Sequence, residues 1–227
     1  PRSRKLRRAG KWFTAQAFPD LTMAPFGDMG GRISLMTYPL TAEIGYRYLG
    51  IDEVGSYRRL RTGDRGMVGL VYGADIIKAR SVPHKSTNLS SGYVALKREA
   101  NGNRLYAGLN ALAPGSGHQH ADRLNLLTYS RDRMLTGEKW IQYHDAEQRI
   151  YAGASYAHNT VTVDETSQIR GNLLTGERTP RIDAFVDLPA GQVAEAHGDK
   201  IARLARTLGA DTCILTLPDS IAWLLNI

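Results

Sequence analysis

Imidazole and carboxylate side chains gather in one stretch of this 227-residue sequence, between residues 115 and 168. His118 and His120 follow a Gly/Ser-rich stretch, and Glu138 and His158 come further along the chain. Neutral imidazoles and a carboxylate are ligands that suit zinc, at roughly 2.0–2.2 Å from the metal. The segment therefore predicts a metal site that joins separate strands. Ligands so widely spaced are a weak signal, and the alternative is that His118 and His120 are loop residues while His158 only makes a hydrogen bond.

The residues around these histidines predict how the imidazoles would be presented. Threonine and valine alternate from residue 160 to 163, which predicts a strand with His158 on its threonine face. His118 and His120 share a face if their segment is extended. One of the two could then bind metal while the other points the same way, into an adjoining cleft.

The composition is that of a globular protein with an excess of positive charge. Apolar residues make up 42% of the chain and charged residues 22%. No run of about 18 apolar residues is present, so we expect no membrane insertion. The formal net charge of +7 favours a polyanionic partner, either nucleic acid, anionic lipid or an acidic polysaccharide. We expect no nucleic acid, because neither interleaved aromatic residues nor a known binding motif accompanies the charge. Six basic residues fall among the first eleven: Arg2, Arg4, Lys5, Arg7, Arg8 and Lys11.

The first part of the chain predicts helices. A basic run is followed by a Pro/Gly-rich loop that extends to about residue 31. Apolar residues recur at steps of three and four over residues 32–49, which predicts a helix that Pro39 kinks or divides. Shorter helices are predicted near residues 54–60 and 67–71, and residues 74–91 are expected to form a linker.

After residue 91 the pattern changes to strands. The turn sequence Asn101-Gly102-Asn103 predicts a hairpin between strands at 93–98 and 104–109. Further strands are predicted at 124–129, 134–135, 160–163, 184–187, 192–196, 202–208 and 213–217. Short strands with turn residues between them are typical of an antiparallel β-sandwich. The expected fold class is therefore α+β, with helices followed by a sandwich.

The segment around the histidines resembles the heparinase II/III-like polysaccharide lyases, a family that includes alginate and heparin or heparan lyases. The resemblance is specific over about 50 residues and looser elsewhere. It rests on the following pieces: His118-Gln119-His120-Ala121-Asp122, a strand, Glu138, Tyr151, and Ser155 through Asp164 with His158-Asn159-Thr160, followed by Gln168. By this resemblance the chain is a fragment. Residues 1–80 would be the tail of an (α/α) toroid, and residues 81–227 would be an antiparallel β-sandwich truncated at its C-terminus.

The resemblance also implies a ligand set. His120, Glu138 and His158 would hold a structural Zn²⁺, and His118 would face the active-site cleft. The family normally has Asp where Glu138 stands, and the extra methylene of Glu moves the ligating oxygen. His144 and Asp145 are close enough in sequence to replace it. Two further residues, Asp122 and Asn159, would orient the histidines.

The implied activity is β-elimination from a polysaccharide that contains uronic acid. Such a lyase needs a base for the C5 proton, an acid for the leaving oxygen and a group that neutralises the carboxylate. His118 and Tyr151 are the candidate catalytic residues, and Arg123 or Arg131 could bind substrate carboxylates. The other catalytic residues of the family lie on the toroid, upstream of the matched segment, so this chain would carry half of an active site.

Two readings of the function stay open. In the first, the chain is part of a lyase that acts on an acidic polysaccharide. In the second, it is a non-catalytic, metal-stabilised β-sandwich that binds an anionic glycan. The resemblance implies a periplasmic or secreted protein, although the sequence contains no signal peptide. The oligomeric state is not predicted.

Overall fold

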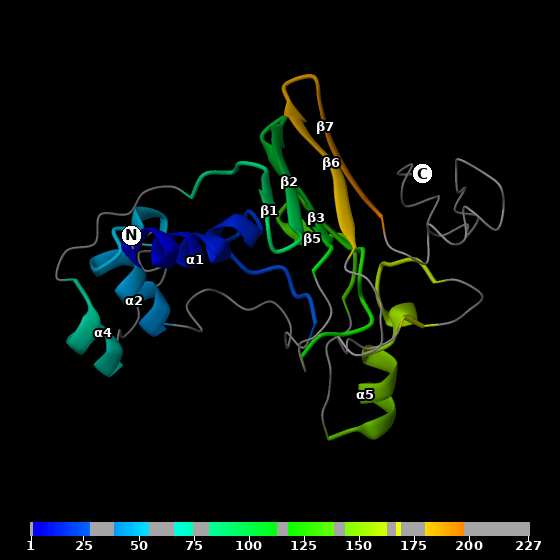
Figure 1. The fold of residues 1–227 in the computed structure, drawn as a ribbon, viewed down its shortest axis with the longest axis horizontal. Helices are drawn as coiled ribbons and strands as arrows, with labels where there is room; N and C mark the ends of the chain where they lie inside the picture. The colour runs from blue at the N-terminus through cyan, green and yellow to red at the C-terminus, as the bar shows by residue number, and fades with distance from the viewer. Residues whose placement is uncertain are drawn as a thin grey trace.

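The computed structural model describes residues 2–27, 39–54, 66–74, 82–112, 118–138, 144–162, 167–168 and 180–197. Helices come first along the chain: α1 (Arg2–Gln16), α2 (Pro39–Arg47) and α4 (Gly66–Tyr72), and residues 52–54 are also helical. Figure 1 shows them on one side of the molecule, with the strands beside them. None of the helices in the described ranges is long and apolar enough to cross a membrane.

The structure confirms some of the predicted helices, and others lie outside the described residues. Helix α4 confirms the helix predicted near 67–71, and α2 confirms the second half of the one predicted over 32–49. Helix α2 begins at Pro39, a position where the missing N–H of proline costs no hydrogen bond. Residues 32–38 and 55–60 lie outside the described residues. We made no secondary-structure prediction for the basic run, which folds as α1; arginine, lysine, leucine and alanine are good helix formers.

A five-stranded antiparallel sheet follows, in the order β1-β2-β3-β4-β5. Its strands are β1 (Thr87–Leu89), β2 (Tyr93–Ala100), β3 (Asn103–Asn110), β4 (Asn125–Ser130) and β5 (Arg133–Met134). The predicted β2–β3 hairpin is confirmed, and Asn101 and Gly102 turn it with φ of 51° and 74°. The prediction of a linker over 74–91 missed β1, whose three residues are too few to show an alternating pattern.

A second, two-stranded sheet pairs β6 (Arg181–Leu188) with β7 (Gly191–His197) and confirms two further strand predictions. The predicted strands at 202–208 and 213–217 lie outside the described residues. The strand predicted at 160–163 was wrong over residues 160–162, which are irregular. This segment instead follows helix α5 (Ala146–Ala152) and the 3-10 turn η2 (Ser155–Ala157), neither of which was predicted. The fold is therefore α+β with antiparallel sheets.

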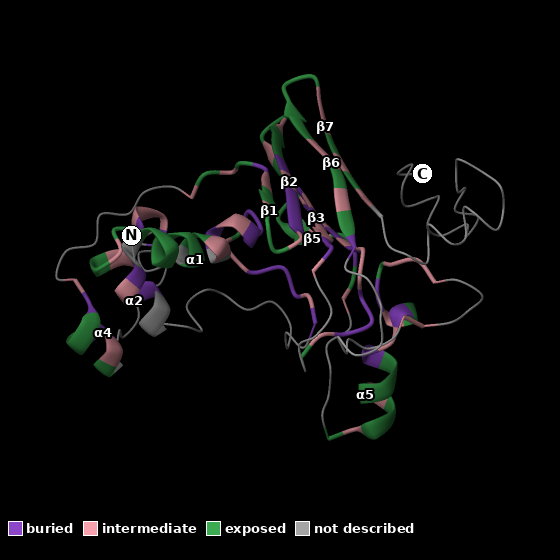
Figure 2. Ribbon diagram, viewed as in Figure 1, coloured by how far each residue is buried: buried purple, intermediate pink, exposed green. Residues whose placement is uncertain are grey.

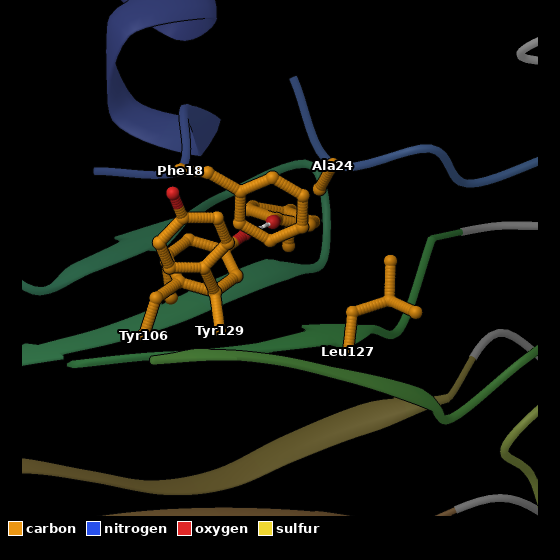
Figure 3. Packing of buried hydrophobic residues seen from close by; sticks show 7 residues of the cluster. Phe18, Ala24, Tyr106, Leu127 and Tyr129 are labelled. Atoms are coloured by element: carbon orange, nitrogen blue, oxygen red, sulfur yellow. Dashed lines mark hydrogen bonds between the residues drawn. The ribbon is translucent and has the colours of Figure 1, made fainter. Parts of the chain in front are cut away.

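One face of the five-stranded sheet is covered by the segment that follows α1. Seven buried residues form what we term the aromatic cluster: Phe18, Ala24, Tyr93, Ala95, Tyr106, Leu127 and Tyr129. Phe18 lies edge-on to Tyr106, with ring centroids 4.7 Å apart, and stacks on Tyr129 at 5.2 Å (Figure 3). The strand residues alternate, so they point to the same face. The cluster joins the N-terminal segment to the sheet and fixes where that segment continues.

Candidate functional site

The segment from His118 to Leu124 is anchored at one end of the sheet. The Asp122 side chain is 2% exposed, and its Oδ2 accepts hydrogen bonds from Gly27 N at 3.3 Å and Asn110 Nδ2 at 3.2 Å. Asn110 is the last residue of β3, and Gly27 ends the segment that covers the aromatic cluster. Asp122 therefore ties three parts of the chain together at the base of the histidine segment.

His118 and His120 do not share an environment, although we expected them to share a face. His120 is 1% exposed, whereas His118 is exposed. The reason is that residues 118–122 form a turn and a bend, so the two-residue periodicity of a strand does not apply. The segment presents one imidazole to the interior and one to solvent.

His158 lies beside His120 in the interior. Its backbone N donates to Ser155 O at 3.1 Å, which closes the η2 turn, and the two imidazole centroids are 5.1 Å apart. Its Nδ1 contacts Oε1 of Glu138, and the side chains are 0% and 3% exposed. Burial lowers the pKa of His158, but the hydrogen bond and negative charge of Glu138 outweigh it, with help from Asp122 and the Ala152 carbonyl, so the pKa is raised.

Asn125, which the sequence analysis did not single out, holds Glu138 in place. Its side chain is fully buried, and its Nδ2 donates to Oε2 of Glu138 at 2.9 Å. Its Oδ1 accepts from the backbone N of Asn159 at 3.1 Å. Asn159 was expected to orient the histidines, and its Nδ2 donates to Gly137 O at 2.7 Å. We call His120, Asp122, Asn125, Glu138 and His158 the histidine network.

Ser155 and Gln168 support this network from outside. Ser155 Oγ donates to Ala121 O at 2.6 Å and accepts from Gln168 N at 2.8 Å. Gln168 Oε1 accepts from Arg123 N at 2.9 Å, and its Nε2 donates to Arg123 O at 3.0 Å. Both residues belong to the segment on which the resemblance rests, but we had given them no role. They close the loops around the histidines.

The remaining candidates lie in different places. Arg123 is half-buried, and burial lowers its guanidinium pKa, an effect that Asp122 partly offsets. Tyr151 is 49% exposed on α5, and its ring centroid lies 5.4 Å from that of Tyr156. Asp145 caps α5, because its Oδ1 accepts from Gln148 N at 3.0 Å, and this hydrogen bond occupies it.

The side-chain types of the network, although not their present spacing, are those that zinc binds. His158 Nε2 is buried and has no hydrogen-bond partner among the described residues, although the Ala152 carbonyl lies close enough to raise the pKa. Two buried imidazoles and a carboxylate are a donor set that zinc accepts. Across the described ranges, however, no three His, Cys, Asp or Glu side chains are grouped closely enough to hold a metal ion. His120, Glu138 and His158 would be the residues to hold one.

Comparison with known proteins decides the family. The model of the heparinase II/III-like C-terminal domain matches residues 83–207, which is more than half of the chain. The chain belongs to this family. The match includes all of the histidine network and every described strand. A search of curated proteins finds no match.

Solved structures of the family agree in fold. Heparan sulfate lyase HepC from Pedobacter heparinus is 14% identical, with a TM-score of 0.57 over 81% of this chain and 26% of its own. A heparinase III structure is 12% identical, with a TM-score of 0.61 over 86% of this chain and 30% of its own. The chain thus spans between a quarter and a third of the length of these relatives.

Proposed function

We propose that this chain is part of a polysaccharide lyase that cleaves an acidic, uronic-acid-containing polysaccharide by β-elimination. The observation that carries the proposal is the division of the histidines within the matched domain. His120 and His158 are buried together beside Glu138, while His118, two residues from His120, is exposed. An exposed imidazole next to an anchored, buried group can reach a bound substrate, as a general acid or base must. The names of the similar structures, heparan sulfate lyase and heparinase III, support the substrate class.

The proposed reaction assigns a different task to each candidate residue. The base removes the C5 proton of a uronate, electrons move to form the C4–C5 double bond, and the 4-linked oxygen leaves with a proton from the acid. His118 is our candidate for the proton transfer at C5 and Tyr151 for the leaving oxygen. The guanidinium of Arg123 would bind the uronate carboxylate and favour the negative charge that develops there.

We extend the proposal to the organisation of the protein. Residues 1–80 would be the tail of a toroid domain and residues 81–227 a β-sandwich domain. The described helices before residue 81, the strands after residue 86 and the start of the family match at residue 83 support this boundary. The toroid would supply the catalytic residues that the matched segment lacks. A secreted or periplasmic location would suit a polymeric substrate.

The direct test is the release of an unsaturated uronate, which absorbs in the ultraviolet, from heparan sulfate, heparin and alginate by a protein that contains this chain together with all of the catalytic residues of the family. We expect His118→Gln to lower kcat at least about tenfold, because general acid–base catalysis contributes on this scale or more. His144→Gln is the matched control, since His144 is also exposed and lies just before α5. Equal activity of the two variants would remove His118 from the mechanism.

The structural Zn²⁺ needs its own measurement. We expect elemental analysis to find about one zinc per chain, and His120→Ala or His158→Ala to lower zinc content and Tm together, because metal binding to the folded state adds to stability. Zinc at full occupancy in both variants would contradict the assignment. When bound, the ion would brace the loop that presents His118.

The charge of the chain favours a second candidate, a non-catalytic domain that binds an anionic glycan. The net charge is +7, and a positive surface attracts polyanions without any chemistry. Binding of the glycan by a protein that contains all of the catalytic residues of the family, with no unsaturated product, would favour this candidate.

A further inference from the structure

The positive charge of the chain is concentrated on one helix. Of 29 basic residues, six lie among the first eleven, which leaves 23 against 22 acidic residues in the rest of the sequence. No acidic residue precedes Asp20. Nearly all of the excess charge is therefore carried by the first part of α1.

This part of α1 is turned to solvent. Residues 4–9 are all exposed, while the residues at and after the C-terminal end of the helix, Gln16 and Phe18 among them, are buried (Figure 2). Two of the cations hold the helix against the segment after α2, because Arg7 Nη2 donates to Gly50 O at 3.3 Å and Lys11 Nζ lies 3.4 Å from Glu53 Oε1. The other exposed cations are not needed for this attachment.

Arg4, Lys5 and Arg8 form what we call the α1 basic surface. Positions 4 and 8, and positions 5 and 8, are neighbours on a helix, so the three charges lie on one side. Within the described residues the side chain of none of the three makes an ion pair or hydrogen bond. Like charges at these spacings, with no acidic residue in the first turn, disfavour the helix. A negatively charged partner would offset that cost.

We propose that the α1 basic surface binds an acidic polysaccharide chain, at a place separate from the histidine network. The class of partner rests on the proposed function, which makes the substrate an anionic glycan. The apolar residue that lies between these cations in the sequence is Leu6, 55% exposed, so no aromatic ring on which a base could stack lies between them. In Figure 1 the N-terminal half of α1 lies beside α2, far from α5 and the segments that lead to His158. The surface would hold a long polymer while another part of it is processed.

The test compares two triple variants of the 227-residue chain that remove the same charge. The first is Arg4→Gln, Lys5→Gln and Arg8→Gln, which keeps residues of high helix propensity. The control is Lys85→Gln, Arg104→Gln and Arg133→Gln, three exposed positions on the strand-containing part. Affinity for heparin, for an unsulfated polyuronate and for double-stranded DNA is measured as a function of salt, and circular dichroism checks the helix content.

We expect the first variant to lose about tenfold or more in affinity for the acidic glycans at low salt. The slope of log affinity against log salt concentration should become shallower by about one for each lost contact. The control should bind like the parent chain. A conservative variant, Arg4→Lys and Arg8→Lys, should also bind normally because it keeps the charge. Equal losses in the first variant and the control, or no loss in either, would overturn the proposal.

The DNA measurement tests the class of partner. Tighter binding to double-stranded DNA than to either glycan, lost in the first variant, would assign the surface to nucleic acid and overturn our proposal. Failure here is distinct from failure of the proposed function. If the protein releases unsaturated product but its glycan affinity does not depend on α1, only this inference is contradicted. If a protein that contains all of the catalytic residues binds the glycan through α1 but forms no product, only the proposed activity is contradicted.

Discussion

The aromatic cluster and the histidine network are both shielded from water, but different contacts hold them together. In the aromatic cluster, Phe18 and Leu127 are 1% and 0% exposed and are surrounded by rings and aliphatic groups. In the histidine network, His120 and Asn125 are equally buried, at 1% and 0%, and Asn125 is held by specific hydrogen bonds to the Glu138 carboxylate and from the backbone N of Asn159. The first region sets the position of the N-terminal segment, and the second sets the geometry of the candidate site.

This difference determines how each region should respond to mutation. Apolar packing loses free energy in proportion to the volume removed, and the neighbours relax in part. A buried hydrogen-bond network loses more than the deleted contact, because the partner left behind has given up its water. The predictions that follow test this contrast, in order of expected size.

Phe18→Ala should cause the largest loss, about 3–5 kcal/mol of unfolding free energy, because it leaves a cavity between Tyr106 and Tyr129. Urea unfolding measures it. Tyr72→Ala serves as the control, since Tyr72 is 41% exposed and should change stability by less than about 0.5 kcal/mol. A loss below about 1 kcal/mol at Phe18 would mean that the N-terminal segment is not anchored by this ring.

Glu138→Leu should cost about 3 kcal/mol, although a leucine is apolar and of similar size. The substitution leaves the His158 imidazole and the Asn125 amide without their carboxylate in the interior. Glu138→Gln, which retains hydrogen-bonding groups, should cost clearly less. Urea unfolding of both variants decides the matter, and equal losses would show that charge and hydrogen bonding at this position are unimportant.

Sequence patterns predicted those parts of the fold that local chemistry decides. The β2–β3 hairpin followed from Asn101 and Gly102, which accept the left-handed conformation of the turn. Helix α1 was not predicted because its first half consists mainly of cations, and its apolar residues, which would indicate a helical period, are concentrated near its buried C-terminal end. The strand expected at 160–163 was wrong because alternation of threonine and valine is also compatible with irregular structure tied by side-chain hydrogen bonds, such as that from Thr160 Oγ1 to Arg123 O at 2.5 Å.

The candidate site shows the same limit. The resemblance named His120, Glu138 and His158, and the structure brings them together. It did not name Asn125, because the role of this residue depends on strand register. Asn125 pairs with Asn110 across β3 and β4, and this places two asparagines at the end of the sheet, one on Asp122 and one on Glu138. The spacing of residues along the sequence does not predict which residues of two paired strands face each other.

Lys97 is the polar exception on the aromatic side. It is 5% exposed, its Nζ lies 5.7 Å from the ring centroid of Tyr106, and burial lowers its pKa from 10.5 to about 8. The folded state therefore binds fewer protons than the unfolded state between these pH values, so stability should rise with pH from about 8 to 10.5. Below pH 8 the folded state bears the full free-energy cost of burying a protonated Lys97, and above about pH 10.5, where the amine is neutral in both states, this cost is absent.

Lys97→Met should consequently stabilise the chain at pH 7, by at most about 3 kcal/mol, since each pKa unit corresponds to about 1.4 kcal/mol. Loss of the cation–π contact with Tyr106 reduces this gain by about 1 kcal/mol. Unfolding free energies of the parent and the variant at pH 7 and pH 10.5 measure the difference. A gain that does not shrink at the higher pH would show that Lys97 is not charged at a cost in the folded state.

Gly27→Ala tests the connection between the two regions, because Gly27 ends the segment that covers the aromatic cluster and contacts the histidine segment. Its φ is +68°, and a Cβ there would lie 2.7 Å from His118 O. Gly50→Ala is the matched control, since Gly50 has φ of +60° and nothing within 4 Å of the added Cβ. We expect a loss of unfolding free energy of about 1 kcal/mol for the control, from backbone strain alone, and of about 2 kcal/mol for Gly27→Ala, where the His118 carbonyl must also move.

NMR signals of the His118 ring should shift in Gly27→Ala and stay in place in Gly50→Ala. If both variants cost the same and the ring signals stay in place, the N-terminal segment does not set the position of His118, and the two regions are independent.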